Sequence, residues 1–174
     1  MTFLTPESGV GQQLAMAEFR FITIWRVAAP VREVYQAIYH SSAWPSWWKG
    51  IETVVALEPG DELGVGGLQR YTWRSRLPYR LTFDMRITRV VPVVALEGVA
   101  SGDLEGTGRW EFSEDGPVTT ICYKWFVRTN KHWMNWLAPI ARPLFNWNHE
   151  MVMRDGAVGL ARMLNARLLT VAHR

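Results

Sequence analysis

The stretch RLTFDMRITRV, residues 80–90, decides the fold class. Apolar residues occupy every second position from Leu81 to Ile87, with Phe83 and Met85 between them, and polar or charged residues fill the alternate positions. In an extended chain, successive side chains point to opposite faces, so this pattern predicts a strand with one buried face and one wet face. Such alternation is typical of an antiparallel sheet.

Further strands are predicted on both sides of this one, because short apolar segments end at Pro, Gly or Asp. No helical segment lies between residues 51 and 128, which favours antiparallel pairing over parallel crossovers. With a largely buried first strand over 19–27, this predicts an antiparallel sheet of about seven strands. The other predicted strands are 51–57, 68–76, 79–90, 93–100, 108–112 and 118–128.

Helical patterns flank the strands. Pro30 suits the first position of a helix that ends near Ser41 and Ser42, and the aromatic run WPSWW, residues 44–48, predicts a short helical turn. After Thr129 the apolar period becomes helical again. Pro139 and Pro143 interrupt it, so we expect a shorter piece from about Lys131 and a longer helix from Pro143 to about Val171.

Composition indicates one domain over residues 18–174, preceded by a loose lead-in over residues 1–17. The 174 residues are 48% hydrophobic and 20% charged, which is typical of a globular chain. No apolar run approaches the roughly 18 residues that span a bilayer, and the first 17 residues lack a signal-peptide pattern. The single cysteine, Cys122, fits a reducing compartment, so we expect a cytoplasmic protein.

The order of these elements resembles the START-like superfamily, also called the helix-grip or Bet v 1-like fold. Within it, the chain is similar to bacterial polyketide cyclase/dehydrase and lipid-transport proteins. The residues that carry the resemblance are 29–35 (APVREVY), 44–48 (WPSWW), 73–79 (WRSRLPY), 102–106 (GDLEG) with Gly108 and Trp110, and Asn148–His149. The resemblance implies an α+β fold, with a curved antiparallel sheet wrapped around a long C-terminal helix and two short helices after the first strand. It also implies a hydrophobic cavity between the sheet and that helix, but no single activity.

Large aromatic residues lie on the apolar parity of the predicted strands. Aromatic side chains on one face of a sheet, beneath a long helix, are suited to line a pocket for an apolar ligand, and tyrosines add hydroxyl groups. The alternative is a plainly packed core. The ligand-binding residues that we predict are Tyr71, Trp73, Phe83, Trp110, Tyr123, Trp125 and His149.

His149 is the candidate for chemistry, because it shares the predicted inner face of the last helix. That face holds Phe145, His149, Val152, Gly156, Leu160 and Met163, although a second apolar stripe through Leu144, Trp147, Met151 and Val158 leaves the helix phase open. An imidazole there would orient a ligand or act as an acid or base near neutral pH. The alternative is a core histidine with one buried partner. Gly156 and Gly159 would allow a close approach of the helix to the sheet or ligand.

The opposite face of two predicted strands carries arginines. A basic sheet face could dock on an anionic membrane or on an acidic partner protein, and the alternative is a solvated face balanced by acidic residues. The arginines are Arg70, Arg74, Arg76, Arg80 and Arg86. Nucleic acid is disfavoured, since the aromatics lie on the other face and the net charge is only +3. The segment 133–137 (WMNWL) is either a gate beside Pro139 or a buried corner.

The sequence thus predicts a carrier or sensor that binds a hydrophobic small molecule, such as a lipid, isoprenoid or polyketide-like compound. One alternative is a cyclase, aromatase or dehydratase in which His149 moves protons and Tyr71 or Tyr123 polarises a carbonyl. A second is a module that binds a partner protein or membrane surface through its basic face. No metal-ligand spacing, nucleophile elbow or phosphate loop is present, so we expect no metal and no cofactor. The sequence leaves the oligomeric state open.

Overall fold

The computed structural model describes residues 18–74, 79–130 and 132–174, with the backbone alone described for 132–141. The predicted lead-in over residues 1–17 and the C-terminal end of the predicted strand 68–76 therefore lie outside the described residues. The elements in chain order are β1 (Glu18–Ala28), α1 (Val31–Tyr39), the 3-10 turn η1 (Ser41–Ala43), α2 (Trp44–Trp47), β2 (Ile51–Glu58), β3 (Leu68–Arg74), β4 (Arg80–Val91), β5 (Ala95–Gly102), β6 (Leu104–Asp115), β7 (Val118–Thr129), α3 (His132–Met163) and β8 (Arg167–His173).

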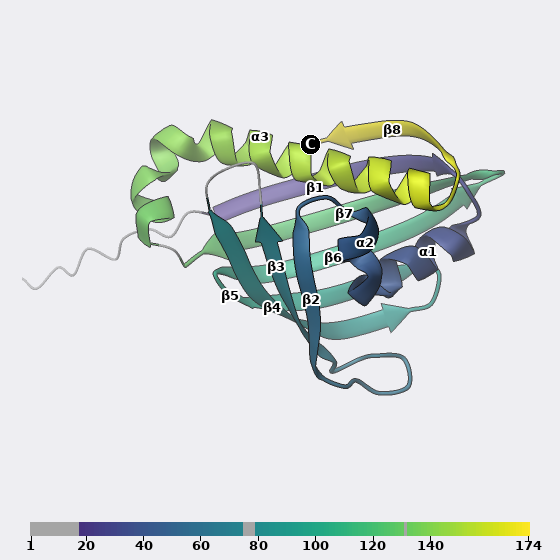
Figure 1. The fold of residues 1–174 in the computed structure, drawn as a ribbon, viewed down its shortest axis with the longest axis horizontal. Coiled ribbons are helices and arrows are strands. Elements are labelled where there is room, and N and C mark those ends of the chain that lie inside the picture. The colour runs from purple at the N-terminus through teal and green to yellow at the C-terminus, as the bar shows by residue number, and fades with distance from the viewer. Residues whose placement is uncertain (1–17, 75–78, 131) are drawn as a thin grey trace, which may run out of the picture.

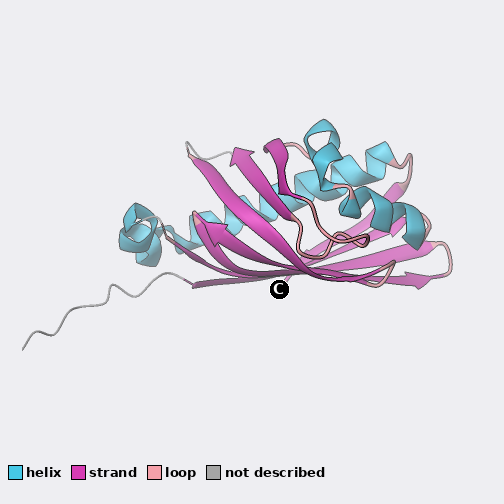
Figure 2. Cartoon of the chain, turned by 90° about the horizontal axis from the view of Figure 1, so that it is seen from below, coloured by secondary structure: helices cyan, strands magenta, loops and turns pink. Residues whose placement is uncertain are grey.

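One antiparallel sheet of 8 strands forms the body of the molecule, in the order β2-β3-β4-β5-β6-β7-β1-β8. Figure 2 shows this sheet curving around α3, with the helices on its concave side. In Figure 1, α1 and α2 cover the sheet beside the C-terminal half of α3. The predicted α+β helix-grip arrangement is therefore confirmed. None of the helices in the described part of the chain is long and apolar enough to cross a membrane.

The prediction for the C-terminal region was wrong in two respects. A single helix, α3, continues through Pro139 and Pro143, although Figure 1 shows that its N-terminal part runs in a different direction from the rest. The helix also ends at Met163 rather than near Val171, and an eighth strand follows it. That strand pairs with β1, from Thr23↔His173 to Ala28↔Arg167, so β1 is an interior strand.

A specific capping motif ends α3. Asn165 has a left-handed backbone with φ of 50°, its N–H donates to Arg162 O over 3.1 Å, and the N–H of Ala166 donates to Ala161 O over 2.8 Å. These two bonds satisfy carbonyls that the last helical turn leaves open, and asparagine tolerates the left-handed conformation better than most residues. The chain then turns back as β8.

Of the two apolar faces predicted for the last helix, α3 buries the one that contains His149, with one exception among its residues. Phe145, Gly156 and Leu160 are buried, whereas Leu144, Trp147 and Val158 of the second stripe are exposed. Met163, predicted to lie on the inner face, is 43% exposed because it belongs to the last turn of the helix.

Gly156 and Gly159 allow a close approach, but to α2 rather than to the sheet or a ligand. A Cβ on Gly156 would lie 2.3 Å from Cε2 of Trp48, and one on Gly159 would lie 1.9 Å from the backbone oxygen of Trp47. The indole Nε1 of Trp48 also donates to Val152 O over 2.9 Å. The aromatic run after the first helix therefore anchors the middle of α3.

Candidate functional site

An apolar cavity of about 120 Å³ lies between the sheet and α3. Strands β3, β4 and β7 contribute aromatic side chains to one wall because the alternation of each strand turns these residues inward. Helix α3 contributes the facing wall, in which Phe145, His149 and Met153 recur at helical spacing. The lining residues are Phe19, Phe21, Trp73, Tyr79, Leu81, Phe83, Leu104, Tyr123, Trp125, Val127, Phe145, Asn148, His149, Val152 and Met153.

A second cavity, of about 230 Å³, shares Trp73, Phe83 and Tyr123 with the first. Residues from Ile38 to Trp44 cover it, and Gln69, Tyr71, Met85 and Trp110 project into it from the sheet. Its lining is more polar than that of the first cavity, because it includes Ser41, Gln69 and Tyr71.

The structure distributes the seven predicted ligand-binding residues over these two cavities. Trp125 and His149 line the first cavity, Tyr71 and Trp110 line the second, and the shared wall is made by Trp73, Phe83 and Tyr123. The shared wall is held by ring contacts on both sides. Tyr123 stacks on Trp110 at a centroid distance of 4.0 Å, and Phe83 lies 5.6 Å from both Tyr71 and Trp125.

His149 reaches the cavity from α3 and lies flat against Phe21 of β1. Its Nδ1 atom is buried and has no hydrogen-bond partner among the described residues. Burial, with a smaller contribution from the nearby His173, lowers the pKa of His149 to about 3. The imidazole is therefore neutral at neutral pH, where it offers a hydrogen bond but is a weak general base.

Two more polar atoms in the wall of the first cavity are buried without a partner in the described part of the chain. They are the indole Nε1 of Trp73, which is a donor, and the side-chain oxygen Oδ1 of Asn148, which is an acceptor. A buried polar group without a partner costs free energy, and most such groups in folded proteins are paired. Counting His149, three of these groups lie around the first cavity.

Both tyrosines of the predicted site keep their protons at neutral pH. Burial raises the pKa of Tyr71 to about 12, although a hydrogen bond with Ser41 acts in the opposite direction. Burial likewise raises the pKa of Tyr123 well above its usual value. Each hydroxyl is therefore neutral, and that of Tyr71 donates to Gln69 Oε1 over 2.6 Å.

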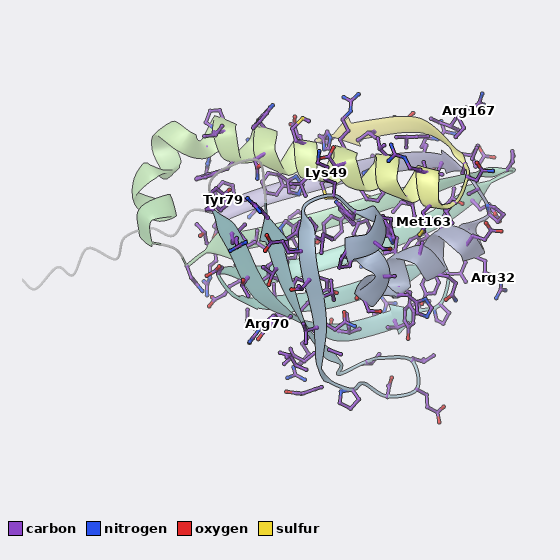
Figure 3. The ribbon with its side chains drawn as sticks, viewed as in Figure 1. Arg32, Lys49, Arg70, Tyr79, Met163 and Arg167 are labelled. Carbon is purple, nitrogen blue, oxygen red and sulfur yellow. The ribbon has the colours of Figure 1, made fainter. Side chains whose placement is uncertain are left out.

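The sequence-based prediction missed several residues that line the cavities. Phe19 and Phe21 lie on the same face of β1 as the buried Trp25, at every second position of the strand. This spacing could have predicted that they point into the cavity. Tyr79 lies at the start of β4 beneath α3 (Figure 3), with its ring 6.3 Å from that of Phe145. Gln69 lies on the same face of β3 as Tyr71 and Trp73. A polar residue among inward-facing aromatic residues could also have been recognised from the sequence as a candidate for the site.

The outer face of the sheet is balanced in charge rather than basic. Arg70 pairs with Asp84 at 2.7 Å, Arg80 with Glu52 at 2.9 Å and Arg86 with Glu58 at 2.9 Å. Arg74 also lies 3.9 Å from Glu52, and Arg76 lies outside the described residues. In Figure 3 Arg70 points away from α3. These pairs favour the solvated-face interpretation of the arginines.

Two features remain, the segment 133–137 of α3 and the side chain of Cys122. The segment 133–137 lies within α3, and its side chains are outside the described residues, so its role as a gate stays a prediction. Cys122 is half-buried, and Tyr123 beside it lines both cavities. Because neighbouring residues of a strand point to opposite faces, Cys122 is turned away from the cavities and from His149.

This chain is similar to known proteins in its fold. No protein-family model matches the sequence. No curated protein matches it either. Among solved structures, the di-domain ARO/CYC BexL from the BE-7585A biosynthetic pathway superposes with a TM-score of 0.68 at 21% identity, over 86% of this chain. The match spans only 51% of BexL, about half its length.

Single-domain structures match over nearly their whole length. The Zhui aromatase/cyclase from Streptomyces sp. R1128 gives a TM-score of 0.69 at 13% identity, covering 86% of this chain and 94% of that one. A START superfamily protein from Mycobacterium smegmatis gives a TM-score of 0.69 at 12% identity, covering 84% of this chain and 98% of that one. At these identities the similarity concerns the arrangement of the backbone.

Proposed function

Because this chain has the helix-grip fold of the START-like superfamily, we propose that it binds a hydrophobic small molecule between the sheet and α3, as a carrier or sensor. The observation that carries the proposal is the apolar cavity of about 120 Å³ lined by Trp73, Phe83, Trp125 and Phe145. Lipids, isoprenoids and polyketide-like compounds are the chemical classes that suit such a lining.

The lining explains why an apolar ligand would be favoured over water. Burial of apolar ligand surface contributes about 25 cal/mol per Å². A ligand with a polar atom would satisfy Trp73, Asn148 or His149, as a water could, and would in addition bury apolar surface against the aromatic rings. The neutral state of His149 keeps the wall free of charge at neutral pH.

A cavity-filling substitution tests the proposal. Val152 lines the cavity from α3, whereas Val158 on the same helix is 40% exposed. We expect Val152→Phe to weaken binding of the apolar probe 2-ethylnaphthalene by about tenfold, since the added ring occupies the space of the ligand. Val158→Phe is the matched control and should leave the dissociation constant unchanged. Binding is measured by quenching of tryptophan fluorescence.

Two results would contradict the proposal. One is a wild-type protein that binds no apolar probe and carries no non-covalent passenger in native mass spectrometry. The other is equal binding by wild type and Val152→Phe while thermal melting shows that both are folded.

The second candidate function is an aromatase/cyclase-type enzyme that acts on a polyketide-like substrate. The observation that favours it is the set of polar groups around the first cavity, with His149 and Tyr123 both in its lining. His149→Ala and Tyr123→Phe distinguish the two functions. An enzyme loses turnover by about 100-fold while it still binds substrate, whereas a carrier changes only in affinity.

A further inference from the structure

The second cavity has a polar end built around the side chain of Gln69. The hydroxyl of Ser41 donates to Gln69 Oε1 over 2.5 Å, and the hydroxyl of Tyr71 donates to the same oxygen over 2.6 Å. Ser41 and Tyr71 are themselves buried, at 4% and 5% exposure. With both hydroxyls donating to Oε1, the Nε2 group of the amide lies on the side away from Ser41 and Tyr71.

This arrangement leaves the other end of the amide open. A glutamine Nε2 carries two N–H donors, and within the described residues none of the hydrogen bonds of Gln69 uses them. Gln69 lines the second cavity together with Tyr123, whose hydroxyl keeps its proton because burial raises its pKa. The polar end of the cavity thus presents hydrogen-bond donors whose orientation is set before a ligand binds.

The charge of the lining restricts the ligand. No lysine or arginine is among the described residues that line either cavity. Glu97 borders the second cavity, and it is already paired with Arg89 and Arg109 on the sheet. A carboxylate or phosphate on a ligand would find no lysine or arginine here; the one described basic residue in the lining of the second cavity is His40, which is exposed at its rim. A buried charge without a counter-charge is very costly.

We infer that Gln69, held by Ser41 and Tyr71, recognises an uncharged carbonyl oxygen of the ligand in the second cavity. The ligand class is therefore an apolar compound with a ketone, aldehyde or ester group, and free carboxylic acids are excluded in their ionised form. This inference rests on the proposed function, because the two cavities share Trp73, Phe83 and Tyr123, and the ligand of the first cavity would extend past these residues to Gln69 in the second.

A matched pair of probes tests it. The compounds 2-acetylnaphthalene and 2-ethylnaphthalene share a ring system and differ in one carbonyl oxygen, so their affinity ratio isolates the contribution of that oxygen. Gln69→Met keeps the length of the side chain and removes the donors. We expect this variant to weaken the binding of 2-acetylnaphthalene by about fivefold to tenfold and to leave the binding of 2-ethylnaphthalene unchanged. The ionised acid 2-naphthoate should bind wild type more weakly than either neutral probe.

Control variants separate recognition from folding. Gln36→Met makes the same change on the exposed face of α1 and should leave both affinities unchanged. Tyr71→Phe retains Gln69 but removes one of the two hydroxyls on its oxygen, so it should weaken acetyl binding by about twofold to threefold. If Gln69→Met does not fold, as judged by circular dichroism, Tyr71→Phe takes its place. The ratio of its affinities for 2-acetylnaphthalene and 2-ethylnaphthalene then shows whether the Gln69 amide recognises the carbonyl.

The outcomes distinguish this inference from the proposed function. Binding of both neutral probes with an affinity ratio that neither variant changes would overturn the role of Gln69 and leave the cavity function intact. Preferential binding of 2-naphthoate would also overturn it, since that requires a cation in the site. Failure of wild type to bind either neutral probe would overturn the proposed function itself.

Discussion

The imidazole of His149 lies parallel to the phenyl ring of Phe21, with 3.8 Å between the ring centroids and 8° between the planes. This contact joins the middle of α3 to β1. The two rings together line the interior cavity, and both also border a cleft of about 170 Å³ next to β8. The stacked pair therefore lies between the first cavity and that cleft.

The protonation of His149 should reduce stability in mild acid. Its pKa is about 3 in the folded protein, against about 6.5 for an exposed histidine, so only the unfolded chain takes up this proton as the pH falls below 6.5. The free energy of unfolding is unaffected above that pH and decreases through the window from 6.5 towards 3. At pH 5 the loss is about 2 kcal/mol.

His149→Phe is the variant that isolates this effect. It retains a ring against Phe21 and removes the titrating group, so its free energy of unfolding should change less between pH 7 and pH 5 than that of wild type. Urea unfolding at each pH measures the difference. The same pH dependence in both proteins, or an imidazole that titrates between pH 6 and 7 by NMR, would contradict the buried neutral state.

Gly156 should not tolerate a side chain, although alanine is the better helix former. A methyl group there would lie 2.3 Å from Cε2 of Trp48, whose indole is buried and bonded to Val152 O. We expect Gly156→Ala to lower the free energy of unfolding by about 1 to 3 kcal/mol, since overpacking outweighs helix propensity. Val158→Ala, at an exposed position on the same helix, should change it by less than about 0.5 kcal/mol. A Gly156→Ala protein as stable as wild type would show that α2 and α3 are not in close contact.

Cys122 should react slowly in the native protein. Burial raises the pKa of its thiol, and Glu111 raises it further, whereas Lys124 and Arg174 act in the opposite direction. The thiolate is the reactive species, so modification by a disulfide reagent at pH 8 should be several-fold slower than in urea. The measurement is direct because the chain has 1 cysteine. Equal rates in the native and unfolded states would contradict the burial of this side chain.

Local patterns were sufficient to predict most of the fold. The alternation over 80–90 corresponds to β4, and Pro30, expected at the first position of a helix, lies one residue earlier, at the N-cap of α1. The aromatic parity of β3 and β7 placed Trp73, Tyr123 and Trp125 inside the sheet, because side-chain direction in a strand follows from position alone. The eighth strand was missed although Asn165 marks the end of α3, because its apolar residues also fit a helical period.

The sequence by itself determined which side chains face inward, since periodicity assigns each residue of a strand or helix to a face. Only the tertiary structure decided what they meet there. It placed Gly156 against Trp48, divided the predicted pocket at Tyr123 into two cavities, and brought Ser41 and Tyr71 onto the oxygen of Gln69. It also lowered the pKa of His149 through burial and paired the outer arginines with carboxylates on other strands of the sheet. These features depend on distances between segments remote in sequence, which the packing of the whole chain sets and no local pattern contains.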